Sequence, residues 1–343
     1  MARKYYIGLD GHSKNCFFVV LNSQGKVIRR EKTPTSEAQI LQFIRQYSGE
    51  IHLVMDETTI TQWLYVLLND KVERIVVTQS ERHSSSKTDF KEAEQHAQDL
   101  RANNLKIRVY HSCDALMELR AMVSGYKDLI QNVVAEKNRY NALFRQSAIT
   151  RAGTSLYKDA EWIKSLRTDS QRFVANPLFE RIQLLERHRE LYEKQFRENC
   201  NTHKEIRLLT SVPGIGAIRA NQIVAQVVSP YRFPTKYNFF AYCLLVRHFQ
   251  NSDGVTYGQK KPHGQSDLKG IFKSSRLSVL KGSSALRLKY DLMLANGASQ
   301  KAAFNALGRS IASTVLGVWK SGQEYNDKKT RERLNSTYKN NLT

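Results

Sequence analysis

Short apolar runs alternate with helix-like segments in the N-terminal third of the chain, and this alternation limits the fold more than any other feature. Three strands are expected in close succession, and helices separate the strands that follow them. Such an order is typical of an α/β domain with a mixed sheet. The expected strands cover residues 5–9, 17–21, 27–31, 51–55, 74–78 and 106–110, and the expected helices cover residues 36–47 and 60–68.

Acidic residues follow two of these strands and begin the next helix. An acid at the end of a strand projects from the edge of the sheet, and two acids three residues apart share one face of a helix. Carboxylates that converge in this way repel one another unless a hard cation binds between them. One such acid alone is more often a turn or helix cap, so it is the ordered set that predicts a site for Mg²⁺, with Mn²⁺ as the alternative ion. The acids are Asp10, Asp56, Glu57, Asp89 and Glu92.

The charge of the chain indicates a polyanionic partner. The sequence carries 53 Lys and Arg against 32 Asp and Glu, a formal net charge of +21. Residues 1–110 hold 16 basic and 13 acidic side chains (+3), whereas residues 205–343 hold 21 basic and 7 acidic ones (+14). Such a field attracts nucleic acid with a salt-dependent affinity. Because 41% of the residues are hydrophobic, the chain is able to bury cores, which excludes a disordered basic tail.

The four cysteines indicate a reducing environment, because they lie far apart without the paired spacing of a zinc ribbon or a disulfide framework. No apolar stretch reaches the roughly 20 residues of a membrane span, and the N-terminus enters a strand without an apolar signal core. We therefore expect a soluble cytoplasmic protein that is not bound to a membrane.

Two long helices are expected in the middle of the chain. Apolar residues recur at spacings of three and four from 113 to 146, and again from 177 to 209 beside many charges. Joined by a bend near residues 148–155, these helices predict an antiparallel hairpin or coiled coil. Its role is a dimerisation arm or nucleic-acid strut in one interpretation and a plain spacer in the other. The chain is thus expected to have three parts, at residues 1–110, 111–204 and 205–343.

The C-terminal part combines a glycine-rich turn with many basic side chains. Residues 213–216, Pro-Gly-Ile-Gly, stand between two helix-like segments. This arrangement resembles a helix-hairpin-helix, whose glycines let backbone N–H groups approach a DNA phosphate, but the same turn also serves as an ordinary helix stop. Residues 247–254 are expected to form a loop, in which Ser252 by itself is a turn residue. The candidate nucleic-acid contacts are Gly214, Gly216, Arg247, Lys260, Lys261, Lys269, Lys273 and Arg276.

One set of motifs, taken in order, resembles a known family. The family is that of the DEDD transposases of the insertion sequence one-ten group, which include the Piv invertase and the bridge-RNA-guided recombinases. The likeness covers nearly the whole chain and implies a RuvC-like (RNase H-like) mixed-sheet domain, a helical coiled-coil connector and a helical transposase domain. Each motif alone is weak, whereas the ordered set is specific. The motifs are Gly8-Leu9-Asp10, Asp56-Glu57-Thr58, Lys87-Thr88-Asp89, Glu92-Ala93, Pro213-Gly214-Ile215-Gly216 and Asn251-Ser252-Asp253-Gly254.

The resemblance implies a Mg²⁺-dependent recombinase that cuts and rejoins DNA. It implies donor DNA, target DNA and a guide (bridge) RNA as partners, and a homo-oligomer that is a dimer or, in the synaptic complex, a tetramer. The residues carried over are the acids Asp10, Asp56 or Glu57, Asp89 and Glu92, with Ser252 as the nucleophile.

Two other functions stand beside this one. A RuvC-like junction nuclease would hydrolyse DNA with metal-activated water and would use Ser252 only structurally. A non-catalytic nucleic-acid-binding protein would need neither the acids nor the serine, and the presence of acids at every expected position counts against it.

Overall fold

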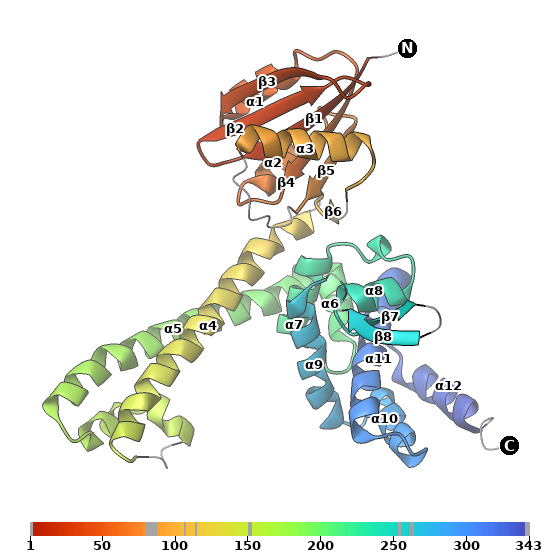
Figure 1. Ribbon diagram of the computed structural model, residues 1–343. Helices are drawn as coiled ribbons and strands as arrows, with labels where there is room; N and C mark the ends of the chain where they lie inside the picture. Colours follow the sequence, from red (N-terminus) through yellow and green to blue (C-terminus); the bar gives the residue numbers. More distant parts are fainter. Residues whose placement is uncertain are drawn as a thin grey trace. The chain divides into compact units, whose positions relative to one another are not determined.

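The chain divides into two compact units, residues 1–117 and residues 118–343. The computed structural model describes residues 3–79, 88–105, 108–113, 115–149, 153–252, 255–260, 262 and 264–339. Figure 1 shows the helices and strands of both units. The boundary between the units falls at residue 117, so residues 118–204 of the connector expected at 111–204 lie in the same unit as the C-terminal part.

The first unit is built on a mixed six-stranded sheet with the strand order β3-β2-β1-β4-β5-β6. Strands β1, β2 and β3 form an antiparallel meander, β4 and β5 run parallel to β1, and β6 pairs antiparallel with β5. This confirms the mixed sheet expected from the sequence, and the order fits an RNase H-like α/β domain. The strands are β1 Lys4–Gly11, β2 Asn15–Leu21, β3 Val27–Pro34, β4 Glu50–Asp56, β5 Arg74–Thr78 and β6 Arg108–Val109.

Helices cover both faces of this sheet. Helices α1 (Glu37–Ile44) and α2 (Thr61–Leu68) pack on one face, where alternate residues of β1 and β4 form the main core of the unit. Helix α3 (Asp89–Arg101) packs on the other face, against β1, β2 and β4. Side chains alternate between the two faces along each strand, so the position of a residue in β1 or β4 decides which helices it meets.

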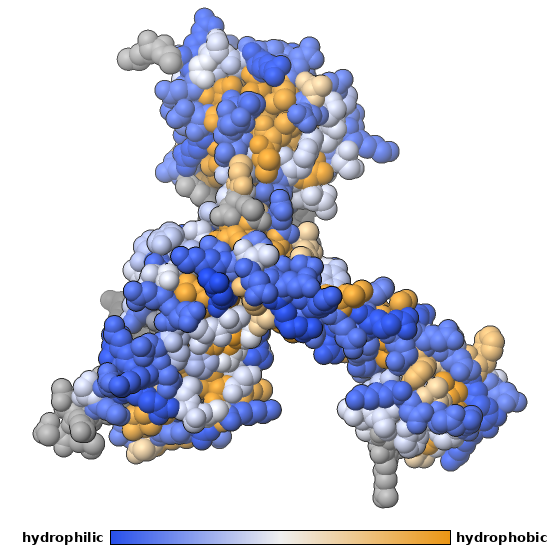
Figure 2. Space-filling view, turned by 180° about the vertical axis from the view of Figure 1, so that it is seen from behind, coloured by the Kyte–Doolittle hydropathy of each residue, from blue (hydrophilic) through white to orange (hydrophobic). Residues whose placement is uncertain are grey.

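The second unit begins with a helical hairpin made of α4 (Leu119–Gln146) and α5 (Asp169–Thr202). The 3₁₀ helices Gly153–Tyr157 and Ala160–Ser165 lie between them in the sequence, and aromatic contacts such as Tyr126–Phe196 join the two long helices. On the side seen in Figure 2, the surface of the hairpin is mostly hydrophilic, with hydrophobic side chains showing at intervals. The hairpin expected from the sequence is therefore present, although its helices have different limits.

The first residues of α4 and α5 both have a local cause. Helix α4 begins at Leu119 rather than near residue 113, because the 3₁₀ turn Ala115–Met117 precedes it. Helix α5 begins well before Pro177, because Thr168 and Gln171 form a reciprocal capping box and Pro177 lies inside the helix. Helix α5 then ends where His203 adopts an extended conformation, so the periodic run expected to reach residue 209 is split in two.

The rest of the second unit is mainly helical. Its helices are α6 Lys204–Thr210, α7 Ala217–Val227, α8 Lys236–Tyr242, α9 Ser266–Leu280, α10 Ala285–Ala295, α11 Gln300–Ser321 and α12 Asp327–Lys339, with a 3₁₀ turn at Pro230–Arg232. Among the residues described, no helix combines the length and the apolar character that crossing a membrane requires.

The loop expected at residues 247–254 is wrong for residues 248–252, and residues 253–254 lie outside the described part of the structure. Residues His248–Ser252 form strand β7, which pairs antiparallel with β8 (Val255–Lys260). The sequence holds a signal for this hairpin in the dipeptide Asp253-Gly254, which is favoured where two residues join antiparallel strands. The polar composition of the segment conceals that signal, because neither strand shows a clear apolar face.

Candidate metal centre and nucleic-acid interface

Asp10 lies near the end of β1, on the sheet face that α3 covers. Gly8, two residues earlier on the same face, touches α3 so closely that a Cβ atom there would lie 1.7 Å from the carbonyl oxygen of Ala93. Any side chain at residue 8 would therefore push α3 off the sheet. The glycine lets the first turns of α3 lie beside Asp10, which is only 6% exposed.

The sheet register places Asp56 and Glu57 on different faces of the sheet. In the parallel pair β1–β4, Leu9 is level with Met55, so the next residues, Asp10 and Asp56, are level with each other on neighbouring strands. Strands of one sheet lie about 4.8 Å apart. Val54, two residues before Asp56, packs with Leu100 of α3, so Asp56 shares the α3 face with Asp10.

Glu57 lies toward the opposite face. Its Oε1 atom is 4.0 Å from Nε2 of His111. The His111 ring in turn packs against Tyr65 of α2, and its Nδ1 atom lies 2.7 Å from Oε1 of Gln62 in the same helix. Alternation along the strand and these contacts both place Glu57 on the side of α2, away from α3.

The acids of α3 occupy its first turn. Asp89 and Glu92 are both there, and Thr88 is the N-cap residue although its side chain makes no capping hydrogen bond. Acidic side chains near a helix N-terminus are stabilised by the helix dipole. Since α3 packs on β1 at Gly8, this first turn is held near the end of β1 where Asp10 lies.

A histidine that the sequence analysis missed completes the cluster. Nε2 of His12 lies 3.2 Å from Oδ2 of Asp10 and 3.8 Å from Oδ1 of Asp89. One ligand atom from each of these three residues lies within 4.8 Å of the other two. Asp56, Glu57 and Glu92 are not in that group of three. The signal for His12 is its spacing, because residue 12 follows Asp10 by two and shares its face of the extended chain.

The electrostatics of this cluster fit a divalent cation. Burial raises the pKa of Asp10, the nearby His12 opposes that rise, and the negative charges of Asp89 and Glu92 add to it. A buried carboxylate beside other carboxylates is destabilised in its charged form, and a hard cation reverses this because it attracts the same oxygens. The carboxylate oxygens of Asp10 and Asp89 are donors that Mg²⁺ and Mn²⁺ prefer, whereas the imidazole nitrogen of His12 is a donor that softer transition-metal ions prefer.

In the second unit, the candidate serine lies at the end of the β-hairpin. Ser252 is the last residue of β7 and is paired with Val255 of β8. The side chain of Ser252 and the whole of Lys261 lie outside the described part of the structure. Arg247 and Lys260 are exposed on or beside the hairpin, Lys273 is exposed on α9, and Lys269 is half-buried there.

Arg276 does not belong to the exposed basic surface. It is 5% exposed, its guanidinium lies 3.9 Å from the centre of the Phe304 ring, and it donates to the Phe304 carbonyl and to Asn305 Oδ1 at 3.1 and 3.0 Å. These contacts join α9 to α11. The assignment of Arg276 to a nucleic-acid surface is therefore corrected, because a side chain that is enclosed in this way is not available to a phosphate.

The two glycines of residues 213–216 have different surroundings in the structure. Gly214 has φ +85°, and a Cβ atom there would lie 2.8 Å from the carbonyl oxygen of Ser275 in α9. Gly216 is the N-cap of α7, has φ −89° and would place a Cβ atom in open space. Gly214 is thus needed for the turn to pack on α9, whereas Gly216 leaves the start of α7 uncovered.

Two family models match the chain. One is described as "Transposase", belongs to the DEDD transposases of IS110 and matches residues 7–149. The other is described as "Transposase IS116/IS110/IS902 family" and matches residues 206–290. The first match includes the acidic cluster, and the second includes the glycine turn, the β-hairpin and α9.

A curated relative agrees with these models. The chain is 26% identical over 138 residues to the "Insertion element IS110 uncharacterized 43.6 kDa protein" of Streptomyces coelicolor, an alignment that covers 40% of this chain and 34% of that protein. The chain thus matches about a third of the length of this relative.

Proposed function

Since the chain belongs to the IS110 family of transposases, we propose that it is a recombinase that cleaves and rejoins DNA. The observation that carries the proposal is the cluster at the end of β1, where Asp10 and Asp89 flank His12 within 4.8 Å. Two carboxylates held this close at the end of a strand are suited to binding cations that act on phosphate.

The proposed ligands of the divalent metal are Asp10, Asp56, Asp89 and Glu92. Asp56 is preferred to Glu57 because Asp56 is level with Asp10 on the α3 face, whereas Glu57 is directed toward His111 and α2. When bound, Mg²⁺ or Mn²⁺ would neutralise the scissile phosphate and the charge that develops on its oxygens. Asp10 would be the central ligand, because burial fixes its carboxylate at the end of β1.

The proposed nucleophile is Ser252. Its Oγ atom would attack the phosphorus of the scissile phosphodiester while the bond to the leaving sugar oxygen breaks, and the serine proton would leave with that oxygen. The resulting phosphoserine bond conserves the energy of the phosphodiester, so a second DNA end is able to displace the serine and restore a continuous strand. The support for this step is the family match over residues 206–290, which includes Ser252.

The proposed partners are donor DNA, target DNA and a guide RNA, bound by a dimer that forms a tetramer in the synaptic complex. The support for nucleic acid as a partner is charge: residues 206–323 hold 16 Lys and Arg but only three acids, Asp253, Asp267 and Asp291. Asp267 and Asp291 are both ion-paired, to Lys127 and Arg287. A surface with so few free carboxylates suits phosphate backbones.

The decisive experiment compares Ser252→Ala with Asp10→Asn in a strand-cleavage assay with end-labelled DNA and Mg²⁺. Both variants should fold and lose cleavage, and only the wild type should leave DNA covalently attached to Ser252 after denaturation. Robust cleavage by Ser252→Ala without an adduct would point to a nuclease that hydrolyses with water. Normal cleavage by Asp10→Asn would contradict the metal centre itself.

A further inference from the structure

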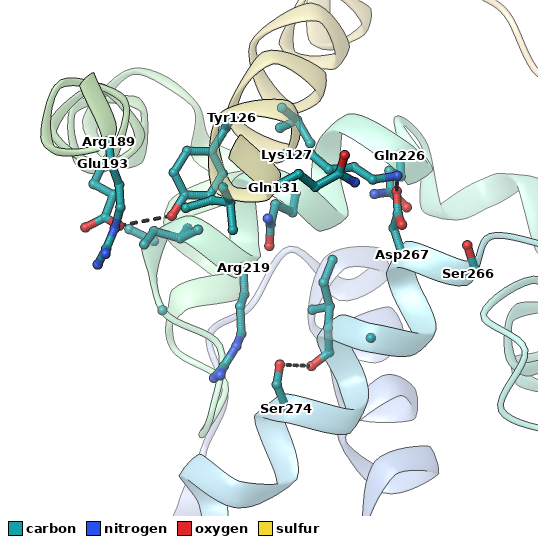
Figure 3. Close-up of a pocket in the computed structure, with 18 of the residues that line it drawn as sticks. Tyr126, Lys127, Gln131, Arg189, Glu193, Arg219, Gln226, Ser266, Asp267 and Ser274 are labelled. Carbon is teal, nitrogen blue, oxygen red and sulfur yellow. Dashed lines mark hydrogen bonds and ion pairs between the residues drawn. The ribbon is translucent and has the colours of Figure 1, made fainter. Parts of the chain in front are cut away.

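A cavity of about 920 Å³ lies within the second unit, between α4, α5, α7 and α9. Figure 3 shows side chains from all four helices around it, among them Gln131, Arg219 and Gln226. Its size is in the range of pockets that enclose a small organic ligand. It is separate from the acidic cluster, which belongs to the first unit.

One end of the cavity is suited to a phosphate. Gly216 leaves the N-terminus of α7 without a side-chain cap, and no acid lies in the first turn of that helix. The first N–H groups of a helix have no partners within the helix and attract anions. The guanidinium of Arg219 lies in this turn and donates to the Gly214 carbonyl and Ser278 Oγ at 2.7 and 2.9 Å.

Two of the three other cations that line the cavity are paired with carboxylates, and the third, Arg197, is exposed on α5. Lys127 is paired with Asp267 at 2.8 Å, and Arg189 is paired with Glu193 at 2.8 Å. Arg219 forms no ion pair with any residue that the structure describes, and burial lowers its pKa. A charged group that is partly buried without a carboxylate is destabilised, and an incoming anion relieves that cost.

The walls of the cavity combine apolar and amide side chains. Val123, Ile130, Ile218 and Ile271 supply apolar surface, and Gln131, Gln222 and Gln226 supply amides. Oε1 of Gln226 is buried and has no hydrogen-bond partner among the residues that the structure describes. A buried acceptor without a partner costs free energy, and a ligand that donates a hydrogen bond would satisfy it.

Arg219, Gln222 and Gln226 share one face of α7, because they are three and seven residues apart. Arg219 and Gln226 are therefore separated by about 10.5 Å along the helix axis. A nucleotide has a phosphate at one end, a base with apolar faces, and a polar base edge at the other end. The cavity has groups that suit these parts in the same order, namely Arg219, the apolar walls and Gln226. Glutamine amides read base edges that carry an amino group, adenine above all.

We propose that this cavity holds one unstacked nucleotide of a single-stranded nucleic acid. The phosphate lies at the α7 N-terminus beside Arg219, the base lies between the apolar walls, and an amino group of the base donates to Oε1 of Gln226. RNA and DNA strands share this chemistry. The inference rests on the proposed function only in that it takes a nucleic acid as the partner of the chain.

The test measures binding of end-labelled 12-mers to the full chain by fluorescence anisotropy in EDTA, so that no cleavage takes place. The strands are rA12, dA12 and rU12. Uracil lacks the exocyclic amino group of adenine and has only its ring N3–H as a donor, so the wild type should prefer rA12 to rU12 by about tenfold. In Gln226→Leu that preference should disappear, while the melting temperature stays equal or rises because an unsatisfied acceptor has been removed.

A second variant fills the cavity. Gly216→Leu places its side chain in open space at a φ that any residue adopts, so the protein should fold and bind rA12 about tenfold more weakly. The matched control is Gly317→Leu, because Gly317 also has open space around it but lies on α11 away from the cavity. Its affinity should equal that of the wild type.

Two further measurements distinguish a nucleotide within a strand from a free nucleotide. One uses free AMP as a competitor, and the other uses 2-aminopurine placed in the A12 strands. A change in 2-aminopurine emission on binding, absent from Gly216→Leu, supports a nucleotide held within a strand. Displacement of rA12 by micromolar AMP, without that emission change, would show that the cavity binds a free nucleotide rather than a nucleotide within a strand. Equal binding of rA12 by Gly216→Leu and Gly317→Leu would overturn the cavity site, and loss of cleavage in Asp10→Asn would stand independently of this result.

Discussion

At the scale of the residue, the carboxylate of Asp10 lies in a buried site that disfavours its negative charge. Burial raises the pKa of its carboxyl above the ordinary value of 3.8, His12 acts against this, and Asp89 and Glu92 reinforce it. A carboxyl whose pKa is higher in the folded than in the unfolded state binds its proton more strongly when folded. The metal-free protein therefore loses stability as pH rises from 3.8 through the folded pKa, and recovers it as pH falls.

Asp10→Asn should consequently stabilise the metal-free protein while it abolishes cleavage. The expected gain in melting temperature at pH 7 in EDTA is roughly 4 °C, which corresponds to about 1 kcal/mol in a domain of this size. The gain should shrink as pH is lowered through the raised pKa of Asp10, because the wild-type carboxyl then takes up its proton. Calorimetry across that pH range checks this, and an unchanged or lower melting temperature at pH 7 would contradict the buried charge.

The neighbouring pair Asp56 and Glu57 gives a second prediction at this scale. Asp56→Asn should reduce Mg²⁺-dependent cleavage by at least about 100-fold, as expected when a group that stabilises developing charge is lost. Glu57→Gln should leave cleavage within a few-fold of the wild type, because Glu57 points toward His111. The two proteins serve as controls for each other, and the opposite order of activities would reverse the assignment.

At the scale of the element, the site depends on how closely α3 approaches β1. The contact at Gly8 leaves no room for a methyl group, since its Cβ would meet the Ala93 backbone rather than a side chain that is able to move. The buried alanines of α3, Ala93 and Ala97, make the same close approach possible from the helix side. A backbone that is displaced here carries Asp89 and Glu92 away from Asp10.

Gly8→Ala should therefore remove cleavage although residue 8 binds nothing itself. Overpacking at a backbone contact should lower the free energy of unfolding by about 3 kcal/mol, and amide hydrogen exchange should rise in α3. Gly317→Ala is the control, because its Cβ meets nothing and a helical alanine should raise stability by up to about 1 kcal/mol. If Gly8→Ala cleaves normally, the packing of α3 does not position the acids.

At the scale of the whole molecule, basic side chains divide into those that face solvent and those that hold helices together. Lys273 is exposed on α9, whereas Arg276, on the same helix, is buried against α11. Only the first kind releases counterions when nucleic acid binds. Net charge alone therefore overstates the number of phosphate contacts that the protein makes.

Nucleic-acid affinity should fall steeply with salt, by roughly 10³-fold between 50 and 200 mM for about six phosphate contacts. Lys273→Gln should reduce the slope of log affinity against log salt by about one. Arg276→Met should instead leave the slope unchanged and lower the free energy of unfolding by about 2 kcal/mol, because charged hydrogen bonds are lost. Equal effects of the two substitutions on the slope would contradict the division of cations.

The sequence by itself determined the elements whose signals are local. The mixed sheet and the two long helices were predictable because apolar periodicity depends on near neighbours in the chain. The start of α5 also has a local signal, the capping residues Thr168 and Gln171. The prediction placed the start at Pro177 instead, because proline is common in the first turn of a helix. The polar β-hairpin had a local signal too, in Asp253-Gly254, which its composition concealed.

Only the tertiary structure decided the roles that depend on burial and on which face a side chain meets. Asp56 and Glu57 are adjacent in the chain, yet the sheet sends them to opposite faces, one toward α3 and one toward α2. Arg276 resembles its exposed basic neighbours in sequence, yet α11 encloses it. Such contacts join residues far apart in the chain, and the free energy of burial that settles them is a property of the packed layers rather than of any local pattern.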